Sequence, residues 1–194
     1  MKLQLPPTQR ALLQELIARA PVEKRARILE VRVAEPNNNE TQASCLVAVT
    51  PHRAESSVSL VMTLGALSGH LFIAAVDESP DEVADVMATI ESYDARRKRL
   101  EPNDCVPIGH QFLHGKGRVA AQILEIEEEG PLKGIPRILE VNDKKYHCLW
   151  VVFLSPEEYA LRMREGTIGL VEAFERTGRD MVRLDPRGQS AGDE

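Results

Sequence analysis

HCLWVVFLSPEEYALRMREG, residues 147–166, joins a run of apolar residues to an amphipathic segment. The apolar part, CLWVVFL at 148–154, has the length and composition of a buried strand. Ser155 follows it at once, with Pro156 next and Glu158 three residues after the serine, which is the pattern of a capping box at a helix start. The stretch therefore predicts a strand that passes directly into a capped helix.

A second junction of the same kind occurs earlier in the chain. The apolar run HLFIAAV at 70–76 is followed by SPDE at 79–82, which again places a serine, a proline and a glutamate at the spacing of a capping box. We expect Ser79 to cap a helix here, and we expect that helix to lie on the sheet through one apolar stripe. The stripe consists of Val83, Val86, Met87, Ile90 and Tyr93.

Further apolar runs of strand length occur before and between these junctions. In RILEVRVAE at 27–35, apolar and charged residues alternate as in a half-buried strand, and PNNNETQ at 36–42 then predicts a turn. Runs this close together favour hairpins, because parallel neighbours need crossovers of about a dozen residues. The sequence therefore predicts a single α+β domain with a mixed or mainly antiparallel sheet and helices packed on it. The other expected strands are ASCLVAV (43–49), VSLVMTL (58–64), VAAQILEIEEE (119–129) and PRILEVNDKKYHCLWVVFL (136–154), the last being a hairpin that turns at NDKK (142–145).

Three segments are expected along the chain. Residues 1–24 contain an N-terminal helix with apolar residues at helical spacing, and Thr8 is expected to cap it. Residues 25–178 form the α+β domain, whose last helix is expected to break at Gly166. Residues 179–194 are expected to form a polar C-terminal tail.

The composition narrows the class of protein. The chain has 194 residues, 43% of them apolar, which suits one compact domain. Its net charge of −6 disfavours a nucleic-acid partner, because the densest basic run, ARRKR at 95–99, is short. No apolar run approaches the roughly 18 residues of a membrane span. An odd number of cysteines and the lack of a hydrophobic leader predict a cytoplasmic protein, and no motif predicts a cofactor.

One loop carries residues that can bind a metal. CVPIGHQFLH at 105–114 places Cys105, His110 and His114 close together, and Cys148 or His147 from a neighbouring strand would complete a tetrahedral zinc site. The spacing is not that of a zinc finger, so the alternative is a loop with polar histidines and a buried free thiol.

The same loop also contains a possible nucleophile. Cys105 with His110 would form a thiol and base pair, as would Cys148 with His147. Adjacent residues on a strand point to opposite faces, which separates the second pair. A small metal-dependent or thiol-dependent enzyme that uses Cys105, His110 and His114 is therefore kept as an alternative function.

Acidic residues gather near the end of one expected strand. Glu125, Glu127 and Glu129 occupy alternate positions, so a strand that extends through them would present all three carboxylates on one face. They can act as a general acid and base, form a solvated face, or form a surface that binds a basic protein partner. We treat these three residues as the candidate partner-binding set.

The order of landmarks along the chain resembles the suppressor-of-fused-like domain family. The segments are SVSLVMTLGALSG at 57–69, LEPNDCVPIGHQFLHGKG at 100–117 and HCLWVVFLSPEEYALRMREGTIGLVEAFE at 147–175. In that family a strand ends in a Thr-x-Gly-x-Ser turn before a helix, a Pro-x-Gly loop follows, and an aliphatic strand later enters a Pro-Glu-Glu helix. The resemblance covers roughly residues 25–178.

The resemblance implies binding and no catalytic residues. In animals such a domain is part of a cytoplasmic regulator that clamps a short peptide of a transcription factor, and bacterial single-domain relatives are thought to be immunity proteins that neutralise a toxin. A single-domain chain of acidic balance is closer to the bacterial type. The hypothesis is therefore a cytoplasmic protein-binding domain of the immunity type, whose acidic face binds a basic toxin. A further alternative is peptide recruitment by an exposed strand edge.

Overall fold

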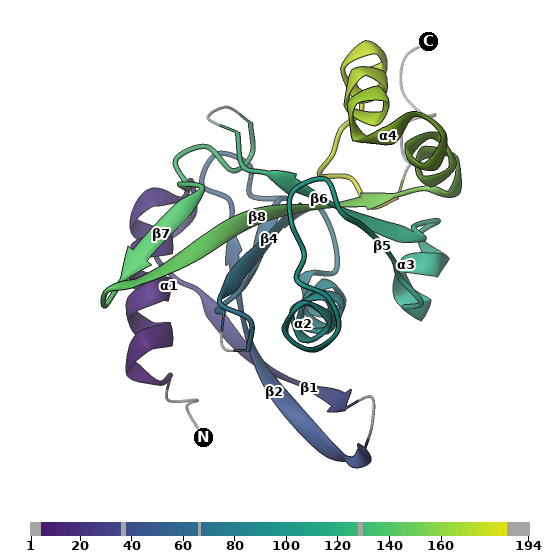
Figure 1. Cartoon of the computed structure of the whole chain (residues 1–194). Helices are drawn as coiled ribbons and strands as arrows, with labels where there is room; N and C mark the ends of the chain where they lie inside the picture. The colour runs from purple at the N-terminus through teal and green to yellow at the C-terminus, as the bar shows by residue number, and fades with distance from the viewer. Residues whose placement is uncertain (1–4, 36–37, 66, 128–129, 186–194) are drawn as a thin grey trace.

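A computed structural model describes residues 5–35, 38–65, 67–127 and 130–185. These residues form one mixed eight-stranded sheet with four helices, so the predicted α+β class is confirmed (Figure 1). The elements are α1 (Pro7–Arg19), β1 (Arg27–Glu35), β2 (Asn38–Pro51), β3 (Ser59–Thr63), β4 (His70–Val76), α2 (Pro80–Arg96), β5 (Cys105–Pro107), α3 (Gln111–Gly115), β6 (Ala120–Glu125), β7 (Ile138–Val141), β8 (Lys144–Leu154) and α4 (Pro156–Thr177).

Strand β8 is the centre of the sheet. The strand order is β1-β2-β3-β4-β8-β6-β5, and β7 pairs with the first part of β8. Pairing is parallel between β4 and β8 and antiparallel between the other neighbours. Residues 148–154 of β8 are all buried, which explains why this run is continuously apolar instead of alternating.

The sheet is covered on both faces. Figure 1 shows α2, viewed end-on, in the hollow of the curved sheet. Val83, Val86, Met87 and Ile90 of the predicted stripe are buried there, and Tyr93 at its end is 37% exposed. A second apolar cluster on the other face includes buried residues of α1 and of the second half of α4. The predicted packing of α2 on the sheet is confirmed.

Both segments expected to flank the domain contribute buried side chains where the structure describes them. Leu12 and Leu16 of α1 are fully buried, and Leu184 near the C-terminal end is 2% exposed. The expectation that Thr8 caps α1 is wrong, because the helix already begins at Pro7 and has no side-chain cap. Proline at the first helical position removes one of the N–H groups that a cap would otherwise bind.

Two predicted turns have different outcomes. The hairpin between β7 and β8 does turn at Asn142 and Asp143, whose φ angles of 51° and 59° suit these two residue types. The polar run at 36–42 is not all turn, because β2 begins at Asn38 and Ala34 pairs with Gln42. Main-chain pairing does not depend on apolar side chains, so a polar run can continue a strand.

The two predicted capping boxes also differ. Ser155 caps α4 with the complete pattern, so that prediction is confirmed. Ser79 makes no side-chain cap on α2, so that prediction is wrong. The predicted break in the last helix is confirmed, because Gly166 has φ 75° and ψ −175°.

Candidate functional site

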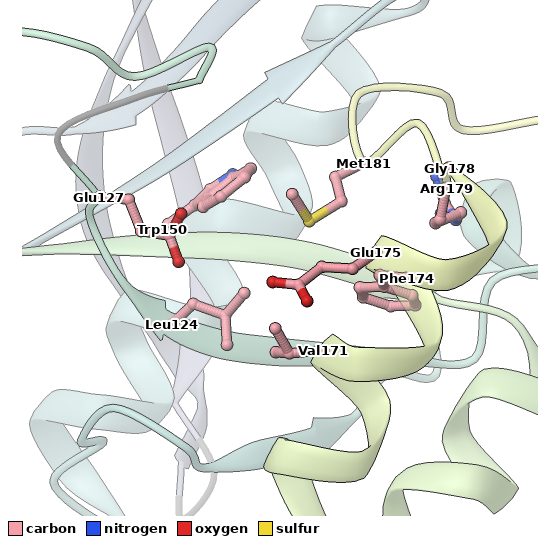
Figure 2. Close-up of a pocket in the computed structure, with 9 residues that line it drawn as sticks. All are labelled: Leu124, Glu127, Trp150, Val171, Phe174, Glu175, Gly178, Arg179 and Met181. Atoms are coloured by element: carbon pink, nitrogen blue, oxygen red, sulfur yellow. The ribbon is translucent and has the colours of Figure 1, made fainter.

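A cavity of about 410 Å³ lies between the sheet and the second half of α4. We call it the α4 cavity (Figure 2). Strands β6 and β8 form one wall, α4 forms the other, and the segment that follows α4 closes one side. The lining residues are Leu124, Glu127, Trp150, Val171, Phe174, Glu175, Gly178, Arg179 and Met181.

The inner wall of the α4 cavity is apolar because the pairing of β6 with β8 brings apolar side chains together on one face of the sheet. Leu124 of β6 and Trp150 of β8 are direct cross-strand partners, so their side chains share one face of the sheet. Phe174 of α4 packs into the same apolar cluster as Trp150. Trp150 is 3% exposed and its indole Nε1 has no hydrogen-bond partner among the described residues. The cavity thus has an apolar wall with aromatic side chains.

Two carboxylates enter the α4 cavity from opposite sides. Figure 2 shows the side chains of Glu127 and Glu175 directed into the space between the sheet and the helix. Both residues are exposed, and neither carboxylate has a hydrogen bond or ion pair with any residue in the described part of the chain. Two unpaired negative charges over apolar side chains attract a cation that also carries apolar surface.

The arginine that lines the cavity does not neutralise these charges. Arg179 donates from Nε to Oε1 of Glu158 at 2.6 Å, and its guanidinium lies over the ring of Phe174 at 5.8 Å from the centroid. Arg179 is therefore held by Glu158, outside the cavity lining, and the lining contains two carboxylates and one guanidinium, so the α4 cavity keeps a negative balance.

A charge network centred on Glu158 lies beside the cavity. Oε2 of Glu158 accepts the main-chain N–H of Ser155 at 2.7 Å and Nη1 of Arg118 at 3.2 Å. Arg118 is 1% exposed and also donates to the carbonyl oxygens of Arg183 and Leu184. Burial lowers the pKa of Arg118, while the charge of Glu158 opposes that shift. The network thus ties the start of α4 to the segment after it, and that segment closes one side of the cavity.

The two described members of the predicted partner-binding set have different surroundings. Strand β6 ends at Glu125, so Glu127 lies just beyond the strand, and the buried Ile126 stands between these two exposed residues. Glu125 pairs with Nη1 of Arg137 at 2.7 Å and does not line the cavity. Glu127 does line it, and Glu129 lies outside the described residues.

The predicted metal and thiol loop does not form a cluster. Within the residues that the structure describes, no group of three or more His, Cys, Asp or Glu side chains is placed to hold a metal ion. Cys105 lies in β5 and burial raises the pKa of its thiol, the direction opposite to that of a reactive thiolate. His114 is exposed and donates from Nε2 to the carbonyl oxygen of Ile108 at 2.7 Å, whereas His110 lines a separate groove beside α2.

The second thiol pair is separated by its strand, as predicted. Cys148 is buried and His147 is exposed, because adjacent residues of β8 face opposite ways. Burial raises the pKa of Cys148 to about 12, so its thiol stays protonated at neutral pH.

None of the helices in the described part of the chain is both long enough and apolar enough to span a membrane.

Comparisons with known proteins identify the fold. A suppressor-of-fused homologue from Neisseria gonorrhoeae FA 1090, solved as a crystal structure, matches with a TM-score of 0.66 and 14% sequence identity over 92% of this chain and 92% of that chain. Suppressor of Fused from Drosophila matches with a TM-score of 0.50 and 10% identity, over 93% of this chain and 50% of that chain. No protein-family model and no curated protein sequence matches the chain.

These likenesses concern architecture. The chain has a suppressor-of-fused-like fold, so the resemblance predicted from the order of its landmarks is confirmed at the level of fold. The chain of this protein matches half the length of the Drosophila protein and nearly all of the Neisseria protein. The identities of 14% and 10% carry no residue roles across to this chain.

Proposed function

We propose that this protein is a non-catalytic, protein-binding domain of the bacterial immunity type, which acts in the cytoplasm and neutralises a basic toxin by binding it. The suppressor-of-fused-like fold supports a protein-interaction role. The net charge of −6 and the sequence pI of about 5.5 favour a partner of opposite charge.

The α4 cavity is the observation that carries this proposal. Its apolar wall and its two unpaired carboxylates suit a basic side chain of another protein. The described residues that line it include no histidine, cysteine or serine, so the site lacks a Ser-His or Cys-His pair. Together these properties favour binding over catalysis.

The test begins with capture of the partner on the tagged protein from lysate of its own organism, followed by mass spectrometry. The purified partner is then assayed for toxic activity while this protein is added stepwise. We expect activity to disappear near one molar equivalent, and we expect added salt to weaken the complex because the attraction is electrostatic.

Two results would contradict the proposal. One is a partner that stays fully active with this protein in large excess. The other is stoichiometric zinc in protein purified without added metal, together with loss of that zinc when Cys105, His110 and His114 are replaced by alanine. The second result would support the enzyme alternative instead.

A further inference from the structure

We propose that the α4 cavity is an anchor pocket that receives one arginine side chain of the protein partner. The inference rests on the proposed function, because it assumes that the ligand is a protein, and it adds the residue type that the partner inserts. Glu127 and Glu175 bind the guanidinium, and the aromatic wall packs against it.

Charge is the first argument. The carboxylates of Glu127 and Glu175 are directed into the cavity from opposite sides and have no partner among the described residues. A guanidinium is planar and has five N–H donors, so it can donate to two carboxylates that approach from different directions. Arginine is therefore the side chain whose donor geometry fits this arrangement.

The apolar wall is the second argument, and it favours arginine over lysine. Leu124, Val171 and Met181 offer contacts for the three methylene groups of an arginine side chain. Trp150 and Phe174 line the cavity with aromatic surface, on which a guanidinium packs better than a compact ammonium group does. The guanidinium of Arg179 lies 5.8 Å from the centroid of the Phe174 ring, so the cavity already contains one contact of this kind.

Size provides the third argument. A volume of about 410 Å³ is in the range of ligand pockets, and it leaves room for a side chain and part of its main chain. Arginine is also one of the residue types that are most frequent among binding hot spots at protein interfaces.

Trp150 also makes the test specific, because it is the one tryptophan of the chain. The probe is the peptide acetyl-Gly-Arg-Gly-amide, titrated into the full-length protein while indole fluorescence and the indole N–H resonance are recorded. Matched peptides carry lysine, or citrulline, which has nearly the shape of arginine but no charge. We expect a saturable change with arginine, and about tenfold weaker binding of lysine and of citrulline.

Two double variants complete the experiment. Glu127→Gln/Glu175→Gln keeps the size of both side chains and is expected to lower the affinity for the arginine peptide by about tenfold or more. Glu140→Gln/Glu172→Gln is the control, because both residues are exposed and neither lines the cavity. The control is expected to bind as the unmodified protein does.

The inference is overturned if citrulline binds as tightly as arginine, if the arginine peptide leaves Trp150 unchanged, or if the two double variants bind equally. These outcomes are separate from the toxin assay. A protein that neutralises its toxin but ignores the arginine peptide would lose only the anchor pocket. One that binds the peptide through Glu127 and Glu175 but neutralises no captured partner would lose only the immunity role.

Discussion

The starts of α2 and α4 have almost the same four residues, SPDE at 79–82 and SPEE at 155–158, yet they are built differently. Ser155 accepts the main-chain N–H of Glu158, and the side chain of Glu158 accepts that of Ser155, which completes a capping box. Ser79 makes no side-chain cap. The same local pattern therefore predicts a helix start in both places but a cap in only one.

Backbone geometry explains the difference. Ser155 follows the last residue of β8 directly and has φ −69° and ψ 167°, so it continues the extended backbone that an N-cap needs. Two residues separate the end of β4 from Ser79, and Ser79 turns the chain with φ 44° and ψ 51°. In this left-handed conformation its hydroxyl does not reach the N–H groups of the first turn.

The start of α2 has no side-chain cap from Ser79, but its acidic residues form ion pairs with distant elements. The carboxylate of Asp81 accepts hydrogen bonds from both terminal nitrogens of Arg27 in β1. Glu78, just before the helix, pairs with Lys116 at 2.5 Å. Two helix starts with one sequence pattern thus depend on different kinds of interaction, which substitutions can separate.

The largest expected difference between the two helix starts concerns the glutamate that ends each pattern. Glu158→Ala is expected to destabilise the protein by about 3 kcal/mol, because it leaves the guanidinium of Arg118 buried without its carboxylate. The change also removes the acceptor for Arg179 and for the N–H of Ser155. Glu82→Ala removes an exposed carboxylate and is expected to change the free energy of unfolding by less than about 0.5 kcal/mol. Urea unfolding followed by circular dichroism measures both.

A third variant separates the two roles of Glu158. Glu158→Gln keeps an oxygen for the N–H of Ser155 but removes the negative charge, so its loss of stability should lie between those of the unmodified protein and Glu158→Ala. Equal losses for Glu158→Ala and Glu82→Ala would show that the charge around Arg118 does not stabilise the fold.

Much of this fold could be predicted from the sequence because its signals are local. The apolar run of β8, the glycine break at Gly166 and the turn at Asn142 and Asp143 all follow from short-range preferences of single residues or short runs. The left-handed backbone conformation of Ser79 could not be predicted, because this conformation depends on how the chain leaves β4 and on what packs around Ser79.

Removal of each serine hydroxyl is expected to have a smaller effect. Ser155→Ala should lower the free energy of unfolding by about 1 kcal/mol, since it leaves the N–H of Glu158 without its acceptor. Ser79→Ala removes no cap and should cost less than Ser155→Ala. Thermal or urea unfolding compares the two, and a cost for Ser79→Ala that matches or exceeds that of Ser155→Ala would contradict this account of the caps.

Glycine at the same two positions should have effects of opposite sign. Ser79→Gly is expected to stabilise the protein by about 0.5 kcal/mol, because a left-handed backbone is strained for serine and not for glycine, although the unfolded chain gains freedom. Ser155→Gly is expected to destabilise it by a few tenths of a kcal/mol. Destabilisation by both substitutions would mean that the conformation of Ser79 is not strained.

The candidate site was predicted less completely than the fold. Glu127 could be singled out because acidic residues are frequent near it in the sequence. Glu175 could not, because it lines the cavity only through the packing of α4 against β6 and β8. Trp150 and Phe174 are apolar residues in apolar runs, and no sequence pattern distinguishes a cavity wall from a filled core.

The smallest effect concerns the titration of Glu157 and is confined to the start of α4. Its pKa is lowered by its own main-chain N–H and then by the hydroxyl of Ser155, which donates to Oε2 at 2.8 Å. A lowered pKa contributes stability above the ordinary pKa of glutamate, and this contribution disappears as the pH falls through the pKa of the folded protein. We therefore expect Ser155→Ala to raise the pKa of Glu157 only part of the way to its ordinary value, because the N–H contact remains, whereas Ser79→Ala should leave it unchanged. A side-chain carboxyl NMR titration of both variants measures this, and an unaltered pKa in Ser155→Ala would show that the hydroxyl does not stabilise the carboxylate.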